Sequence, residues 1–219
     1  QNISVLYQPG LGQVRPYYAK RHLVMFGETI PFKKSVPWLH HWLLTFTPYP
    51  DQDVLSLTPG DAWTRYTLSN PTDPAHPYKF GTPICYEDIM PRPAQQFTRP
   101  VHGKKQVDFL TTISNDGWYT SAPELAQHLQ MDQLRAVENR VPIARSVNGG
   151  NSGFVNSDGR IMKLVSNGRV LQGSDGIAVL RMPLDRRVSL YSRMGDLLPI
   201  LCGIGGALAV AWTIVRPRR

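Results

Sequence analysis

Short apolar runs bounded by turn residues divide the chain into a series of predicted strands. Such runs are typical of buried strands, and they lie at 2–7, 80–85, 107–114, 143–147, 153–156, 160–165 and 177–181. The stretch NSDG at 156–159 predicts a hairpin turn between two of these strands. We interpret the polar, proline-rich segment 51–77 as loop.

One amphipathic helix interrupts this pattern. Ser121 and Glu124 have the spacing of a capping box, and Pro123 suits the first helical turn. One half of the helix is apolar and the other is polar; the apolar half has Leu125, Ala126, Leu129, Leu134, Ala136 and Val137, and the polar half has Gln127, His128, Arg135, Glu138 and Asn139. We expect this helix to cover a sheet on one side. The order of strands and helices predicts an α/β layered body.

The segment 31–50 is rich in tryptophan and histidine, and we interpret it as an apolar arm or short helix. Its exposed positions would include Trp38, Trp42 and Phe46. Two roles fit this pattern equally well, namely contact with lipid and a plain covering loop.

The segment 197–215 has no charged side chain and has the composition of a transmembrane helix. At ~1.5 Å per residue it spans about the ~30 Å hydrocarbon core of a bilayer. Arg216, Arg218 and Arg219 follow, and the positive-inside rule puts them in the cytoplasm. We therefore expect a catalytic body at 1–196 outside the membrane, a span at 197–215 and a basic cytoplasmic tail at 216–219. A buried core helix is the alternative, and the basic end argues against it.

Charge narrows the class of partner. The net charge is +8, which suits nucleic acid or anionic lipid. The sequence has no basic helix, zinc-finger spacing or aromatic RNA-binding signature, so we expect no nucleic-acid partner. The basic residues near the apolar segment favour a lipid surface instead. The six histidines show no metal-ligand spacing, so we expect no metal.

Cys85 is the strongest candidate for chemistry. The chain has two cysteines, and Cys202 lies inside the apolar segment 197–215, which leaves Cys85 as a lone thiol. Cys85 ends the predicted strand 80–85, and we expect Tyr86, Glu87 and Asp88 to open a helix whose positive end faces the sulfur. A small buried apolar residue is the plainer alternative.

Lys20 is the second candidate, because a lysine beside a thiolate can stabilise its charge and donate to a tetrahedral oxyanion. Glu28 follows it in the same motif, at the end of a glycine-containing turn. Taken singly, both residues also fit an ordinary solvated surface position. They indicate a catalytic site only in combination with Cys85.

Three motifs, in order, give a resemblance to a known family: YYAKRHLVMFGETIP, PICYEDIMP and ISNDGWY. They resemble motifs of the nitrilase, or carbon-nitrogen hydrolase, superfamily, and in detail those of its membrane branch, the bacterial apolipoprotein N-acyltransferases. The stretch SLYSRMGDLLP followed by one apolar helix is similar to the way that family ends. The resemblance covers nearly the whole chain.

The resemblance implies a nitrilase-like αββα sandwich, incomplete in this chain, followed by one transmembrane helix. It also assigns roles to residues of the three motifs. Cys85 would be the nucleophile and Lys20 the lysine of a Glu-Lys-Cys triad, with Glu28 and Glu87 as further active-site glutamates. Tyr86, Asn115 and Trp118 would line the substrate and oxyanion pocket.

The reaction that the resemblance implies is a two-step acyl transfer without a cofactor. Cys85 takes an acyl chain from a phospholipid as a thioester and passes it to the N-terminal amine of diacylglyceryl-cysteine in an apolipoprotein. The expected location is the bacterial inner membrane, with the catalytic body in the periplasm and the C-terminus in the cytoplasm. Gly203, Gly206 and Ala207 would pack on upstream transmembrane helices of the same parent protein.

The resemblance also leaves gaps. The family's triad glutamate precedes the lysine, whereas the first acidic residue here is Glu28, so we expect the general base upstream of Gln1. Met25 stands where the family usually has proline.

Two other functions stay open, namely a nitrilase-type amidase acting on a small amide and a truncated, non-catalytic relative that binds lipid or lipoprotein.

Overall fold

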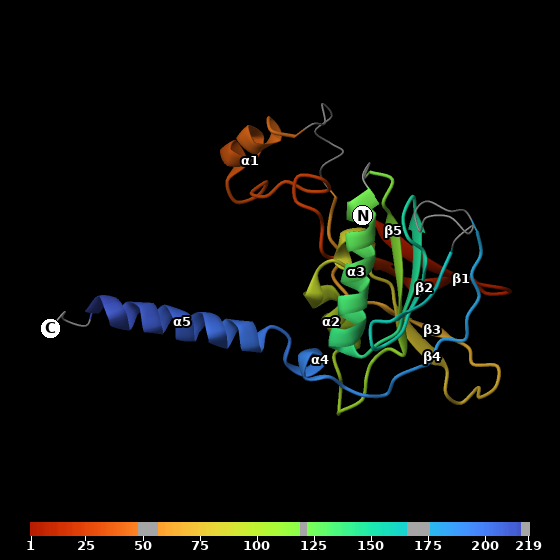
Figure 1. Cartoon of the computed structure of the whole chain (residues 1–219). Coiled ribbons are helices and arrows are strands. Elements are labelled where there is room, and N and C mark those ends of the chain that lie inside the picture. Colours follow the sequence, from red (N-terminus) through yellow and green to blue (C-terminus); the bar gives the residue numbers. More distant parts are fainter. Residues whose placement is uncertain (48–56, 119–121, 166–175, 216–219) are drawn as a thin grey trace.

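A six-stranded mixed sheet forms the centre of the protein. The computed structural model describes residues 1–47, 57–118, 122–165 and 176–215 (Figure 1). The strand order is β3-β4-β5-β6-β7-β8, with bounds Arg65–Leu68, Tyr78–Gly81, Phe109–Asn115, Ile143–Asn148, Gly153–Val155 and Ile161–Leu164. The middle pairs β4–β5 and β5–β6 are parallel, and the remaining pairs are antiparallel. Parallel neighbours require crossover connections, which the helices supply.

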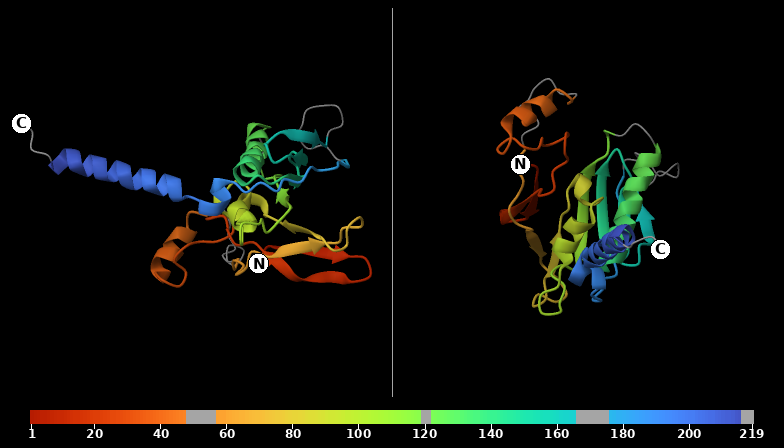
Figure 2. Two further views of the ribbon diagram at one scale, coloured as in Figure 1. Left: turned by 90° about the horizontal axis from the view of Figure 1, so that it is seen from below. Right: turned by 90° about the vertical axis from the view of Figure 1, so that its left-hand side faces the viewer.

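Helices cover one face of this sheet. The crossover from β4 to β5 contains α2 (Pro91–Thr98), and the crossover from β5 to β6 contains α3 (Ala122–Asn139). Crossovers between parallel strands are right-handed as a rule. Both crossovers here lead to the next strand on the same side, β4 to β5 and β5 to β6. The two helices therefore lie on the same face of the sheet, as Figures 1 and 2 show. The short α4 (Leu190–Met194) packs against both helices. Phe97, Leu110, Leu129 and Ile143 form part of the core between these layers.

A separate hairpin is made of β1 (Ile3–Gln8) and β2 (Gly12–Ala19), and Lys20 directly follows its second strand. Tyr66 of β3 attaches this hairpin: its hydroxyl accepts from the Tyr18 N–H at 2.8 Å and donates to the Ser4 carbonyl at 2.5 Å. At the end of β2, Gly60 N–H donates to the Lys20 carbonyl at 2.9 Å. A Cβ on Gly60 would meet the Ala19 carbonyl oxygen at 2.2 Å, so this close approach requires glycine.

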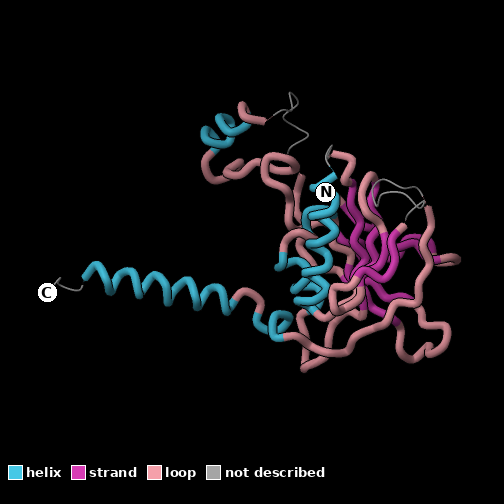
Figure 3. Tube along the Cα trace, in the orientation of Figure 1, coloured by secondary structure: helices cyan, strands magenta, loops and turns pink. Residues whose placement is uncertain are grey.

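Two apolar helices project from the body, as the tube in Figure 3 shows. The first is α1 (Pro37–Leu44), whose Trp38 and Trp42 are exposed. The second is α5 (Leu197–Val215), which extends from α4. Within the described residues, Leu197–Ile214 is the one stretch long and apolar enough to cross a membrane, with mean hydropathy 2.0 and none of it buried.

Most predicted strands are confirmed. The runs at 2–7, 107–114, 143–147, 153–156 and 160–165 correspond to β1, β5, β6, β7 and β8. The predicted strand 80–85 corresponds to β4, which ends earlier, at Gly81. The predicted hairpin turn is present, with the Gly159 N–H donating to the Asn156 carbonyl at 2.9 Å. The α/β class is therefore confirmed.

Three predictions of elements are wrong or incomplete. The segment 51–77 is not all loop, because it contains β3, which pairs with β4. The segment 177–181 is not a strand: Ile177 is 93% exposed and Val179 78%, and neither joins a sheet. Two further elements, β2 and α4, were not predicted. Ser121, the predicted capping residue, lies outside the described residues.

The buried face of α3 differs from the predicted one. His128 and Arg135 are each only 4% exposed, although we assigned both to the polar half, while Leu134 is 49% exposed. The physical reason is that these side chains have buried polar partners. His128 lies between Asp88 and Asp116, and Arg135 donates to the Ile89 carbonyl at 2.6 Å.

Phe97 tests the packing between α2 and the sheet. Its ring is fully buried and makes edge contacts with Tyr18 and Trp63. We expect Phe97→Ala to lower the free energy of unfolding by about 3–5 kcal/mol because it leaves a cavity. Chemical denaturation in detergent would measure this loss. The control Leu134→Ala, at a half-exposed position, should cost less than about 1 kcal/mol; equal losses would show that the core is placed wrongly.

Candidate active site

Cys85 lies in a strained turn at the edge of the sheet. It opens the single 3-10 turn Cys85–Glu87, and its backbone has φ of 52°, a left-handed value that non-glycine residues rarely adopt. The preceding Ile84 forms a parallel bridge with Ile113 of β5, so the turn lies beside this strand. The thiol is half-buried and unpaired. Strain of this kind persists only where the surroundings fix the backbone.

The helix expected to open at Tyr86 is absent. A 3-10 turn occupies this position, and α2 begins only at Pro91. Proline explains the interruption, because it disfavours helical backbone at the residue before it. Met90 accordingly has the extended values φ −84° and ψ 131°. The prediction that a regular helix starts directly after Cys85 is therefore wrong.

The Glu87 carboxylate attaches the turn of Cys85 to the end of β2. Its Oε1 accepts from the Tyr18 hydroxyl at 2.8 Å and from the N–H groups of Arg21 and His22, both at 2.9 Å. Its Oε2 accepts from the Ile84 N–H at 2.9 Å. The side chain is completely buried. Burial and the adjacent carboxylate raise the pKa of Tyr18, which keeps this hydroxyl a donor. Glu87 thus joins two segments that are distant in sequence.

Lys20 is buried at the point where β2 ends, and Glu28 is its partner. The Lys20 Nζ donates to Glu28 Oε2 at 2.7 Å, and the lysine side chain is wholly inaccessible to solvent. The same oxygen accepts from the Val24 N–H at 2.9 Å, and Asn2 Nδ2 donates to Oε1 at 3.3 Å. Burial would raise the pKa of Glu28, but these hydrogen bonds and the lysine charge hold it below its ordinary value. Glu28 is therefore a carboxylate at neutral pH, and it accepts a hydrogen bond from Lys20.

The aromatic and amide candidates Tyr86, Asn115 and Trp118 are half-buried or exposed, and we call these three side chains the rim. The ring of Tyr86 stacks on His22, with centroids 6.3 Å apart. Asn115 ends β5, where its Oδ1 accepts from Asn148 Nδ2 at 2.9 Å. Trp118 is 73% exposed. These side chains are accessible to a substrate, whereas Lys20 and Glu87 are buried beneath the surface.

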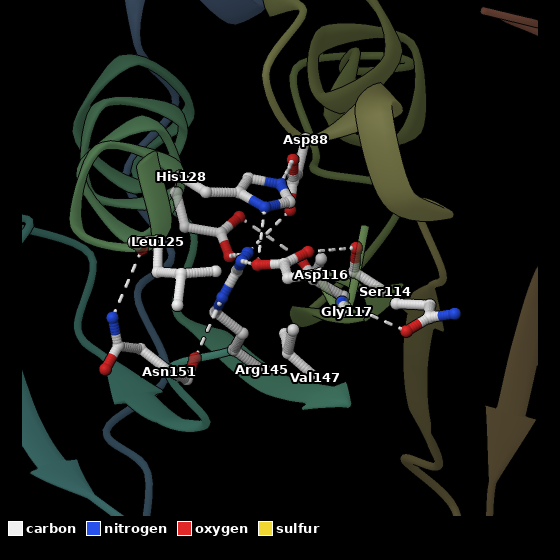
Figure 4. A network of polar contacts seen from close by, with 12 residues as sticks. Asp88, Ser114, Asp116, Gly117, Leu125, His128, Arg145, Val147 and Asn151 are labelled. Atoms are coloured by element: carbon white, nitrogen blue, oxygen red, sulfur yellow. Dashed lines mark hydrogen bonds and ion pairs between the residues drawn. The ribbon is translucent and has the colours of Figure 1, made fainter. Parts of the chain in front are cut away.

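Behind the turn lies a buried network of charges, shown in Figure 4. His128 of α3 contacts Asp88 Oδ1 through Nε2 at 2.6 Å and Asp116 Oδ2 through Nδ1 at 2.8 Å. Arg145 of β6 donates to Asp88, Asp132 and Asp116 at 2.6, 2.6 and 3.2 Å. All five residues are at most 4% exposed.

Charge compensation shifts the pKa values in this network. Burial lowers the pKa of His128, but hydrogen bonds to Asp116 and Asp88 outweigh this effect and raise it to about 9. Burial and the neighbouring Asp88 charge raise the pKa of Asp132. The hydrogen bonds from His128 and Ser114 hold the pKa of Asp116 below its ordinary value despite its burial. Within the described residues no group of three or more His, Cys, Asp or Glu side chains is arranged to hold a metal ion.

The structure thus brings Lys20, Glu28 and Glu87 to one region beside the turn of Cys85. Sequence reasoning missed Tyr18, His128 and Arg145, which complete the surroundings of this turn. A signal for Arg145 was available, since a charged residue inside the apolar run 143–147 requires a buried partner. The pattern gave no comparable signal for Tyr18.

Comparison with known proteins identifies the family. Residues 6–184 match the carbon-nitrogen hydrolase family, and the chain therefore belongs to it. This membership confirms the nitrilase-like α/β fold.

The curated relatives share one name. An apolipoprotein N-acyltransferase of Chlorobaculum tepidum is 32% identical over 210 residues, covering 95% of this chain and 36% of the relative. Apolipoprotein N-acyltransferase 1 of Treponema denticola is 28% identical, covering 90% of this chain and 32% of the relative. The chain thus spans about a third of the length of these relatives.

Solved structures of the same family are more distant. A carbon-nitrogen hydrolase from Helicobacter pylori has 15% sequence identity and a TM-score of 0.47, covering 77% of this chain and 53% of that one. An amidase from Nesterenkonia has 14% identity and a TM-score of 0.41, covering 72% of this chain and 52% of that one.

Glu87→Gln tests the junction between the turn and the end of β2. An amide nitrogen cannot accept the hydrogen bonds that one carboxylate oxygen now accepts, so buried N–H groups lose their partner. We expect the free energy of unfolding to fall by about 2–4 kcal/mol. Denaturant unfolding in detergent would measure it.

The matched control for this variant is Asp158→Asn, at a carboxylate that is 50% exposed and pairs with Arg140. It should cost less than about 1 kcal/mol, as exposed ion pairs do. If Glu87→Gln is as stable as this control, Glu87 does not join the two segments.

Proposed function

We propose that this chain carries the nucleophile of an apolipoprotein N-acyltransferase, which moves an acyl chain from a phospholipid to a lipoprotein precursor. The observation on which this rests is the turn of Cys85, attached by Glu87 to the buried Lys20 segment. A lone half-buried thiol in a strained turn, attached to the segment that carries a buried lysine, suits an activated nucleophile. The name shared by the relatives selects acyl transfer among the reactions of the family.

The first half-reaction forms a thioester. The Cys85 thiol gives its proton to a general base, a glutamate that the family resemblance places upstream of Lys20. The thiolate sulfur attacks the ester carbonyl of the phospholipid and forms a tetrahedral oxyanion. The oxyanion collapses, the ester C–O bond breaks, and the lysophospholipid alkoxide leaves with the proton. Lys20 and the Tyr86 N–H stabilise the oxyanion, because the first N–H groups of a helical turn have no partner inside the turn.

The second half-reaction consumes the thioester. The N-terminal amine of diacylglyceryl-cysteine attacks the thioester carbonyl, the C–S bond breaks, and the Cys85 thiolate is released. The amine loses one proton, which returns the base and thiol to their starting state. A thioester is reactive towards amines, so the amide forms with a favourable driving force. No metal ion or dissociable cofactor takes part in either step.

The roles of the other site residues follow from their positions. Glu28 stabilises the charge of Lys20 and fixes its orientation. Tyr86, Asn115 and Trp118, which lie at the accessible rim, contact the substrates. We assign residues 1–196 to the catalytic body.

A lipid substrate explains the apolar helix. We propose that α5 crosses the bacterial inner membrane, with residues 1–196 in the periplasm and the basic tail 216–219 in the cytoplasm. Its exposed apolar surface supports this assignment, because none of the stretch Leu197–Ile214 packs on the body. Upstream transmembrane helices of the parent protein would pack against it. Such an anchor places the thiol of Cys85 next to its phospholipid donor.

The acyl-enzyme is the direct test of this proposal. We expect the natural full-length protein, incubated with phospholipid, to carry one hydroxylamine-sensitive acyl group on Cys85, detected by intact-mass and peptide analysis. The matched control is Cys202→Ala, which should retain the adduct, while Cys85→Ala should lose it. An adduct that persists in Cys85→Ala refutes the proposal. Hydrolysis of a small amide without acylation by phospholipid would establish the amidase instead.

Lys20→Arg tests the oxyanion role of the lysine. Arginine keeps the positive charge, but its planar, larger head group presents its donors differently in a fully buried site. We expect the rate of Cys85 acylation to fall by about 100-fold or more, the loss typical of a missing oxyanion donor. Single-turnover acylation assays would measure it. Lys104→Arg, at an exposed lysine, should act like the natural protein; an unchanged rate in Lys20→Arg would remove Lys20 from catalysis.

A further inference from the structure

The bonding of His128 fixes its protonation state. Its two ring nitrogens lie 2.6 Å from an oxygen of Asp88 and 2.8 Å from an oxygen of Asp116. An ionised carboxylate accepts hydrogen bonds but donates none, so both ring nitrogens must carry a proton. A neutral imidazole would face one of the two carboxylates with a lone pair. The geometry therefore requires an imidazolium between the two aspartates.

The two aspartates belong to the two segments that form the candidate active site. Asp88 ends the 3-10 turn that Cys85 begins, and its N–H donates to the Cys85 carbonyl at 3.1 Å. Asp116 directly follows Asn115, and Ser114 donates to it at 2.7 Å. His128 comes from a third element, α3, and lies between them, as Figure 4 shows.

We propose that His128 is a positioning residue: its imidazolium fixes the turn of Cys85 at a set distance from the loop of Asn115 and Trp118. The hydrogen bonds of the ring go to Asp88 and Asp116, so it acts through these two aspartates. Loss of its charge would leave two buried carboxylates facing each other, and the two segments would separate. The nucleophile would then be misplaced relative to Asn115 and Trp118.

The charged groups around His128 support this role. Asp88 faces it from the turn, Asp116 from the end of β5, Asp132 from α3 and Arg145 from β6. Arg145 donates to all three aspartates and neutralises part of their charge, and His128 faces the two that belong to the active-site segments. Removing the charge of His128 alone unbalances a site from which water is excluded.

The sign of the pH dependence follows from the direction of the His128 shift. Its pKa in the folded protein is raised from 6.5 to about 9. The stabilisation is therefore fully present below about 6.5 and is lost as the pH rises through about 9. The difference in melting temperature between the natural protein and His128→Gln should accordingly narrow above about pH 9.

The experiment compares hydrogen–deuterium exchange in three variants of the natural full-length protein. His128→Gln keeps a donor for Asp116 but turns its amide oxygen towards Asp88. We expect exchange to rise at least tenfold in two peptides, those covering 84–88 and 115–118, and Cys85 acylation to fall at least tenfold. The double variant His128→Gln with Asp88→Asn restores a donor opposite the amide oxygen and balances the charge. It should return exchange to within threefold of the natural protein.

Thr98→Val is the matched control. It removes a buried hydrogen bond between α2 and α3, from Thr98 Oγ1 to Asn139 Oδ1 at 2.8 Å, without touching the charged network. It should leave exchange at 84–88 and 115–118 within twofold. Unchanged exchange in His128→Gln would overturn the proposal, and so would equal changes in Thr98→Val or no recovery in the double variant. This role rests in part on the proposed function, but exchange is measured without substrate, so its result stands even if no acyl transfer is found.

Discussion

The candidate site depends on one buried carboxylate, that of Glu87. Its hydrogen bonds join Ile84, which precedes the nucleophile, to Arg21 and His22, which follow Lys20. A buried charge is costly unless hydrogen bonds satisfy it, and here three backbone N–H groups and one hydroxyl do so. One interaction therefore fixes both the position of Lys20 and the strained backbone of Cys85.

Asp88, the residue after Glu87, attaches the turn of Cys85 on its other side. Glu87 bonds towards the hairpin, whereas Asp88 bonds towards His128 and Arg145 on the helix-covered face of the sheet. The turn of Cys85 is thus attached on two sides by consecutive acidic residues. This double attachment explains how a non-glycine residue keeps φ of 52°. Cys85 itself packs against the border of the core and forms no disulfide, so its thiol is available for chemistry.

The sequence predicted the strands of the sheet well, because their apolar runs are short and clearly bounded by turn residues. It predicted the position of Cys85 at the sheet edge for the same reason. It could not predict how α3 is oriented, since the burial of His128 depends on two aspartates from distant segments, Asp88 and Asp116. The run 177–181 looks like a strand but pairs with no strand among the described residues, and pairing is not a local property. Tyr18 was missed because a tyrosine in a strand is ordinary until its hydroxyl meets Glu87.

In the proposed mechanism, the Lys20 segment and the turn of Cys85 together stabilise the acyl group on sulfur. The decisive measurement is an experimental structure of the natural full-length protein trapped with Cys85 as its acyl thioester. We predict the Lys20 Nζ and the Tyr86 N–H within about 3.5 Å of the thioester carbonyl oxygen. A thioester oxygen that turns away from both donors, with Lys20 still bound only to Glu28, would contradict it.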